Sequence, residues 1–172
     1  MNITEDQFRK TLGLFPTGVT VATTSKELGS SVGITISSFT SVSLEPPQVL
    51  FCLSKKSKKI QAFEQARYFA INILKADQSH LSDGFAQRGP LDIQALKTHE
   101  HPQTGCLLIT DALGHVICEK KVMYEGGDHY IILGGVIDLM ADPGELPLIR
   151  QKGQYLTLQS LIKNEPLRCH QA

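Results

Sequence analysis

The chain has 172 residues, of which 41% are hydrophobic and 20% charged; these values fit one domain over residues 1–172 and exclude a largely disordered chain. Its 17 basic and 17 acidic residues balance, so no net charge draws it to nucleic acid. The sequence shows no membrane-length apolar run, no secretory signal and no C-x-x-C pair, and we therefore expect a reduced, cytoplasmic protein.

The first predicted element is a short helix. Thr4 can be its N-cap, with Gln7 as the reciprocal partner three residues later. Phe8 and Leu12 fall on one helical face, and Gly13 marks the end. We therefore expect a helix over residues 4–12.

Apolar patterns typical of strands recur along the rest of the chain. They cover residues 19–22, 32–36, 49–53, 68–74, 106–110, 115–124 and 129–139. Helical spacing predicts two more helices, over residues 58–67 and 77–88, with Asp77 as a candidate N-cap of the second. The first two strands are expected to form a hairpin.

Many short strands with few helices predict a mainly β domain, either a barrel or a sandwich. A doubly wound nucleotide fold is disfavoured, because strands and helices do not alternate and neither a G-x-G-x-x-G turn nor a P-loop is present. Residues 89–105 lack periodicity and are predicted to form a long loop. Gly126-Gly127-Asp128 is predicted to be a tight hairpin turn, and residues 146–161 a tail.

Residues 35–43 (TISSFTSVS) hold six hydroxyl side chains in nine positions. Such a segment offers neutral donors and acceptors and leaves backbone N–H groups accessible, which suits a ring with hydrogen-bonding edges or a phosphate. The same composition is typical of a polar strand end with turn chemistry. On the residues alone both interpretations stay open.

Four lysines surround Ser57, a candidate N-cap, where the second helix is predicted to begin; they are Lys55, Lys56, Lys58 and Lys59. Positive charge at this end opposes the helix macrodipole, which prefers anions there. A bound phosphate would remove the conflict. A solvated basic turn, the alternative, would cost only about a few tenths of a kcal/mol per charge.

His129 follows the glycine turn and is the clearest titratable candidate. It could bind a carboxamide or a phosphate, or assist proton transfer, or be an ordinary hairpin residue with a satisfied side chain. The polar residues Asp92, His99, Glu100 and His101 are irregularly spaced, so we expect solvated side chains there and no metal site.

Six segments occur in a recognisable order. They are FPTGVTV (residues 15–21), GITISSFTSVSLEPP (33–47), FAINIL (69–74), FAQR (85–88), GDH (127–129) and GQY (153–155). This ordered set, which spans most of the chain, resembles the flavin reductase family, the reductase components of two-component flavin monooxygenases.

The resemblance implies a mainly β fold with flanking helices, a six-stranded antiparallel split β-barrel of the FMN-binding type, forming a homodimer. It implies hydride transfer from NADH or NADPH to FMN or FAD, with reduced flavin supplied to a separate monooxygenase. Neither nucleic acid nor a membrane is an expected partner. A flavoprotein that keeps its FMN as an electron carrier, and a pyridoxamine-phosphate-oxidase-like enzyme, remain alternatives on the same barrel.

The resemblance also implies the residues of the site. The flavin is expected to lie against Thr35, Ile36, Ser37, Ser38, Ser41, Val42, Ser43, Asn72 and Phe85. Ser57, Lys58 and Arg88 are expected to meet its phosphate. His129 and Tyr155 are expected to face the nicotinamide, with His129 as the candidate catalytic residue.

Overall fold

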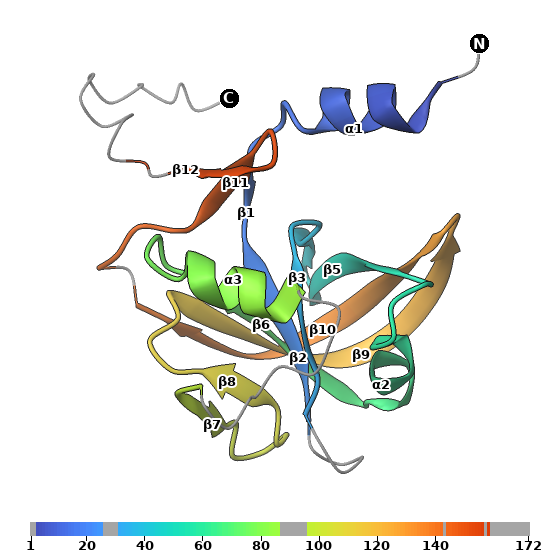
Figure 1. Ribbon diagram of the computed structural model, residues 1–172. Helices are drawn as coiled ribbons and strands as arrows, with labels where there is room; N and C mark the ends of the chain where they lie inside the picture. Colours follow the sequence, from blue (N-terminus) through green and yellow to red (C-terminus); the bar gives the residue numbers. More distant parts are fainter. Residues whose placement is uncertain (1–2, 26–30, 87–95, 143, 157, 159–172) are drawn as a thin grey trace.

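The computed structural model describes residues 3–25, 31–86, 96–142, 144–156 and 158, and it is mainly β (Figure 1). Its helices are α1 (Glu5–Leu12), α2 (Ile60–Gln65) and α3 (Ser79–Ala86). Its strands are β1 (Thr17–Gly18), β2 (Thr20–Thr24), β3 (Gly33–Ile36), β4 (Thr40–Leu44), β5 (Pro47–Ser54), β6 (Tyr68–Ile73), β7 (Thr98–Glu100), β8 (Leu107–Ile109), β9 (Gly114–Gly126), β10 (His129–Ala141), β11 (Ile149–Gln151) and β12 (Gln154–Leu156). None of the helices in these residues is long and apolar enough to cross a membrane.

The main sheet has seven strands, in the order β3-β2-β6-β9-β10-β5-β4, and all the neighbours are antiparallel. The expectation of six strands is not met, because the hydroxyl-rich segment supplies an edge strand of its own, β4. The two edge strands, β3 and β4, are joined by only three residues, 37–39. The sheet must therefore curl until its edges lie close together.

Ser38, in the connection between the two edge strands, is hydrogen-bonded to β5. The Ser38 hydroxyl accepts a hydrogen bond from the Cys52 backbone N–H (2.9 Å) and donates one to the Cys52 carbonyl (3.1 Å). No strand pairing joins β3 to β4 in the part of the chain that the structure describes. We call this open line between β3 and β4, spanned by residues 37–39, the seam.

The core occupies both faces of the sheet, since successive side chains of a strand point to opposite faces. On one face Phe51 packs edge-on against Phe63 of α2 and Phe69 of β6, with ring centroids 5.7 and 5.3 Å apart. On the other face, Val21 and Phe85 belong to a cluster to which β8 and α3 contribute. Figure 1 shows α3 lying across this second face.

Most of the expected elements are confirmed. The Thr4 capping box is present, with Thr4 Oγ1 accepting from the Gln7 N–H (3.2 Å) and Gln7 Oε1 accepting from the Thr4 N–H (3.0 Å). β2 and β3 form the expected hairpin, and β9 and β10 are joined by a tight turn in which Gly127 has a φ of +70°.

Four expectations are wrong. The predicted loop 89–105 contains β7, which pairs with β8. The predicted tail contains the β11–β12 hairpin, which joins β1 in a small sheet. Ser57 is not the N-cap of α2, because that helix begins at Ile60 after Lys59, which makes no side-chain cap bond. α3 begins only at Ser79, two residues beyond Asp77.

Candidate functional site

The hydroxyl-rich segment lies at the seam and along β4, and about half of it is exposed. Ser37, Ser41 and Val42 are exposed, and Ser43 is half-buried on the edge strand β4. Ser38 is the exception, since both hydrogen-bonding roles of its hydroxyl are used by Cys52 on β5. The seam and β4 therefore present hydroxyl groups and the apolar side chain of Val42 at the surface. The hydrogen bonds between Ser38 and Cys52 hold the backbone of the seam against β5.

Thr35 connects this segment to α3. Its hydroxyl donates to the Ser82 carbonyl (2.6 Å), and the Ser82 hydroxyl in turn lies 2.9 Å from the Tyr155 hydroxyl of β12. Tyr155 also donates to the Asp83 carboxylate (2.7 Å), and burial raises the pKa of this tyrosine. Ser82 and Asp83, which lie in none of the sequence motifs, thereby link β3, α3 and β12.

Two of the expected flavin residues have side chains in the core. Ile36 is 6% exposed and belongs to the aromatic cluster around Phe51. Phe85 is 1% exposed, and its ring lies directly against the backbone of Gly33. These two side chains therefore belong to the core clusters on the two faces of the sheet and do not point to the surface.

Asn72 is also fully buried, and its side chain makes three hydrogen bonds within the protein. Its Nδ2 group donates to the Val21 carbonyl (3.0 Å) and to Thr23 Oγ1 (3.1 Å), while its Oδ1 accepts from the Ile109 N–H (2.8 Å). The amide thereby joins β6 to β2 and β8.

The four lysines after β5 divide into two kinds. Lys55 forms an ion pair with Glu125 and lies over the Tyr130 ring, and the bond to Glu125 raises the pKa of Lys55. Lys59 is half-buried and donates to backbone carbonyls. Lys56 and Lys58 are exposed, and Lys58 makes no hydrogen bond or ion pair with the described residues.

We call residues 54–59 the lysine turn, and its conformation is well defined by hydrogen bonds. The Ser57 hydroxyl accepts from the Lys59 N–H (3.2 Å), and the Ser57 N–H donates to the Ser54 carbonyl (3.0 Å). The Ser57 hydroxyl proton and the Lys58 ammonium remain available to an anion. Arg88, the third residue expected at the phosphate, lies outside the described residues.

His129 lies beside the lysine turn, because the Lys55 N–H donates to the Asp128 carbonyl (3.0 Å) and His129 pairs with Ser54. Its Nδ1 is 2.8 Å from Asp128 Oδ1, and this bond lowers the pKa of Asp128. No described contact joins His129 to Tyr155. In Figure 1 the tip of the β9–β10 hairpin and β12 lie well apart.

The expectation of solvated side chains around residues 99–101 is confirmed for the exposed His99 and Glu100 and is wrong for His101. His101 is buried and hydrogen-bonds with Thr104 (3.0 Å) and Asp138 (3.1 Å). His99 lies edge-on to His115, with ring centroids 6.2 Å apart. Asp92 lies outside the described residues.

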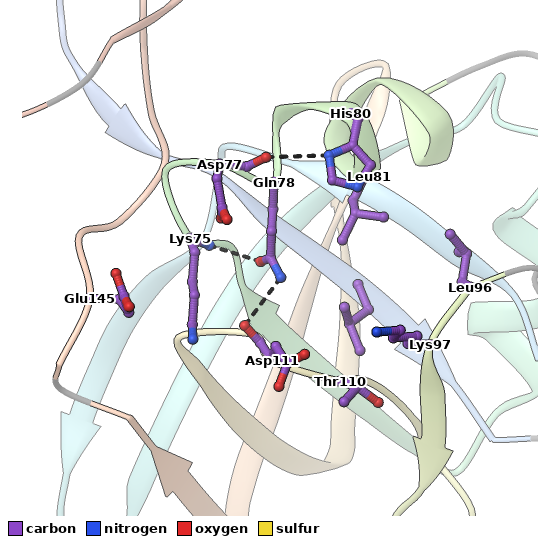
Figure 2. A pocket seen from close by; sticks show the side chains of 11 residues that line it. Lys75, Asp77, Gln78, His80, Leu81, Leu96, Lys97, Thr110, Asp111 and Glu145 are labelled. Carbon is purple, nitrogen blue, oxygen red and sulfur yellow. Dashed lines mark hydrogen bonds between the residues drawn. The ribbon is translucent and has the colours of Figure 1, made fainter.

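A cavity of about 410 Å³ lies elsewhere, between α3 and the end of β8 (Figure 2). Figure 2 shows Gln78 at its wall, hydrogen-bonded to the Lys75 N–H and the Asp111 carbonyl. None of the residues that sequence reasoning selected for the flavin or the nicotinamide lines it.

Comparisons with known proteins agree with the sequence resemblance. The family described as flavin reductase like domain matches residues 12–159. The reductase subunit HsaB of a flavin-dependent monooxygenase from Rhodococcus jostii (strain RHA1) is 37% identical over 153 residues, which are 89% of this chain and 77% of HsaB. The FMN reductase (NADH) SmoA from Agrobacterium fabrum (strain C58 / ATCC 33970) is 40% identical over 132 residues, 76% of this chain and 73% of SmoA.

A solved structure is similar over nearly the whole chain. It is the Streptomyces globisporus C-1027 NADH:FAD oxidoreductase SgcE6, in complex with NAD and FAD fragments, with a TM-score of 0.84 and 33% identity. The similarity covers 91% of this chain and 96% of that one. The matched region includes the seam, the lysine turn and the β9–β10 hairpin, and the chain belongs to the family of proteins with a flavin reductase like domain.

Proposed function

We propose that this protein is an NAD(P)H-dependent flavin reductase that reduces FMN or FAD and supplies reduced flavin to a partner monooxygenase. The observation that carries the proposal is the position of the two segments relative to β5. The lysine turn begins at the end of β5, and Ser38 in the seam is hydrogen-bonded to Cys52 on the same strand, two residues before the turn. The relatives SmoA and HsaB, named as an NADH-dependent FMN reductase and a monooxygenase reductase subunit, support it.

The chemistry of the donor set fits a flavin phosphate ester. Lys58 and the Ser57 hydroxyl offer a charged and a neutral donor to a phosphate. The exposed hydroxyls of the seam and of β4, together with Val42 on β4, suit a flat ring whose edges carry polar atoms and whose faces are apolar. These residues would contact the phosphate and the ring of a flavin.

When both ligands are bound, the chemistry is hydride transfer from the nicotinamide to the flavin, which belongs to the cofactors themselves. The contribution of this chain is to hold the rings in contact and in register, which can supply much of the rate. His129 is a positioning candidate for the nicotinamide, because Asp128 Oδ1 accepts from its Nδ1–H and leaves Nε2 to accept from a carboxamide N–H or, in the doubly protonated ring, to donate to a phosphate oxygen.

The curled sheet with its open seam is, we propose, an FMN-binding split barrel that works as a homodimer. Large apolar side chains on β4 and β10 are exposed: Val42 48%, Leu44 93%, Ile137 48%, Leu139 65% and Met140 38%. α1, which projects from the body in Figure 1, also has no buried residue. Exposed apolar surface of this extent favours a protein partner, and sedimentation at micromolar concentration would count against a dimer if only monomer were found.

We further propose a single domain over residues 1–172 located in the cytoplasm. Cys52 and Cys118 form no disulfide with the described residues, as expected in a reducing compartment, and Cys169 lies outside the described residues.

The test is anaerobic, stopped-flow mixing of the protein and flavin with NADH or NADPH, using FMN and FAD in turn. We expect rapid bleaching of the flavin with one nicotinamide, and transfer of the reduced flavin through a dialysis membrane to an oxygenase or to cytochrome c. Flavin that stays bound to the protein without turnover would identify an electron carrier instead. Oxidation of pyridoxamine phosphate would identify the third alternative.

A Lys58→Ala variant tests the phosphate assignment. We expect FMN binding to weaken about ten- to a hundredfold, since a lost charged hydrogen bond is worth roughly 1.5–3 kcal/mol, while riboflavin binding is little changed. Equal weakening of both ligands would show that Lys58 does not read the phosphate.

A further inference from the structure

Lys59 differs from the other lysines of the turn in what it contacts. Its Nζ donates to the Gly33 carbonyl (2.7 Å) at the start of β3 and to the Phe85 carbonyl (3.0 Å) near the end of α3. Two of its three donors are therefore committed to the backbone. The side chain is half-buried, and burial lowers the pKa of its ammonium group.

The two carbonyls that Lys59 joins are already in close contact through their residues. A Cβ placed on Gly33 would lie 2.4 Å from Cε1 of the Phe85 ring, so the ring lies flush against the glycine backbone. The Phe85 carbonyl is one of the last of α3, where a helix favours a cation. Lys59 thus completes a contact between β3 and α3 that consists of the Gly33 backbone, the Phe85 ring and the Lys59 ammonium group. We call this contact the joint.

This joint lies between the two halves of the proposed flavin site. On one side, β3 runs from Gly33 directly into the seam. On the other, the Lys59 N–H is bonded to the Ser57 hydroxyl, so the position of Lys59 fixes that of the turn. A flavin phosphate ester carries its phosphate at a set distance from its ring, and a site that reads both must hold the two halves at that spacing.

We propose that Lys59 is a positioning residue that sets the spacing between the lysine turn and the seam, and hence the preference for a flavin phosphate over riboflavin. It acts through Gly33 and Phe85 and is not itself the phosphate ligand. This inference deepens the proposed function, on which it rests.

The chain contains a matched control. Lys120 is also half-buried, and its Nζ donates to two backbone carbonyls at the end of a helix, those of Phe63 (2.8 Å) and Glu64 (2.5 Å) in α2. Burial lowers the pKa of this lysine too. Its contacts lie at the opposite end of α2 from the lysine turn, so its loss should reproduce the structural cost of losing Lys59 without the change in spacing.

The experiment is titration of the flavin-free protein with FMN and with riboflavin, for wild type, Lys59→Met, Lys59→Arg and Lys120→Met, with the urea midpoint of each variant measured in parallel. Lys59→Met should reduce the ratio of FMN to riboflavin affinity at least about tenfold. Lys59→Arg, which can still donate to both carbonyls, should restore the ratio to within about threefold of wild type. Lys120→Met should lower the urea midpoint comparably and leave the ratio unchanged.

Equal losses of FMN and riboflavin in Lys59→Met, or a fallen ratio in Lys120→Met, would overturn the proposal. If the methionine variant does not fold, Lys59→Gln is used in its place. An unchanged ratio of FMN to riboflavin affinity in that variant would also overturn the proposal. A wild type that binds FMN no better than riboflavin would remove the phosphate site and this proposal with it. A wild type that prefers FMN but is not reduced by NADH or NADPH would refute the reductase activity alone, because the binding ratios test Lys59 independently.

Discussion

Replacement of Asn72 by leucine tests whether this residue supports the fold or contacts the flavin directly. Leucine has nearly the same shape, so the substitution removes the three hydrogen bonds without opening a large cavity. The buried Ile109 N–H would be left without its acceptor, at about 1–3 kcal/mol. The lost bonds to the Val21 carbonyl and the Thr23 hydroxyl add about 0.5–1.5 kcal/mol each.

Together these losses amount to about 2–6 kcal/mol. Thr23 keeps a bond to the Leu107 carbonyl (2.5 Å), so the total loss should stay below the upper end, at about 2–5 kcal/mol. Urea unfolding of Asn72→Leu measures it. A double-mutant cycle with Thr23→Val should give a coupling of about 1 kcal/mol, since the two side chains share a hydrogen bond. The FMN affinity of the folded protein should change less than about twofold, or 0.5 kcal/mol.

The opposite pattern would refute this reasoning. If Asn72→Leu lost less than about 1 kcal/mol of stability while FMN affinity fell tenfold, the Asn72 amide would be a flavin contact. Its hydrogen bonds in the core would then contribute little to the stability of the fold.

Three further predictions follow from particular contacts. His129→Ala should raise the KM for NADH or slow hydride transfer, while the Kd of oxidised FMN stays within about twofold; single-turnover reduction at the wild-type rate would exclude His129 from the nicotinamide site. Gly134→Ala should lower the free energy of unfolding in urea by about 1–3 kcal/mol, because its Cβ would lie 2.4 Å from Cζ of the packed Phe69 ring. In the control, Gly135→Ala, the new Cβ meets only the flexible end of Lys121, and the loss of stability should be clearly smaller. Equal losses in the two variants would contradict this account of the packing. Burial lowers the pKa of His115 below 6.5, and the nearby His99 adds to the effect. The unfolded chain therefore binds a proton more readily than the folded one, and stability is lost as the pH falls below about 6.5. His115→Gln should flatten the slope of the unfolding free energy against pH, and parallel slopes for the two proteins would show that another group causes it.

The long elements could be predicted from the sequence because their buried faces impose a pattern. β9 and β10 were expected within a few residues of their bounds, and the turn between them was marked by its glycines. β4 could not be found in this way. Most of its side chains are exposed, so this edge strand has no buried face to produce alternation. β7 is only three polar residues long, and β11 and β12 meet at a turn in which the lysine Lys152 takes a φ of +49°.

The site was predictable as segments but not as individual roles. Composition and resemblance selected the seam and the lysine turn, yet the four lysines are the same residue type in one short run. Only the tertiary structure distinguishes Lys59, whose ammonium group reaches β3 and α3, from Lys58, which is exposed. Ser82 and Asp83 carry no motif, and their contact with Tyr155 joins segments more than seventy residues apart.

The strand order also has a consequence for the path of folding. β9 and β10 are neighbours in the sequence, so their hairpin closes only a short loop, whereas β5 pairs with β10 through residues 48–54 and 129–135 and must close a far longer one. β3 and β4 are close in the sequence, but they become the two edges of one curled sheet only after that distant pairing. A chain on a ribosome or in a refolding buffer therefore acquires its local hairpins well before it has a place for flavin, and in that interval the unpaired edges of β4 and β5 are the segments most exposed to aggregation.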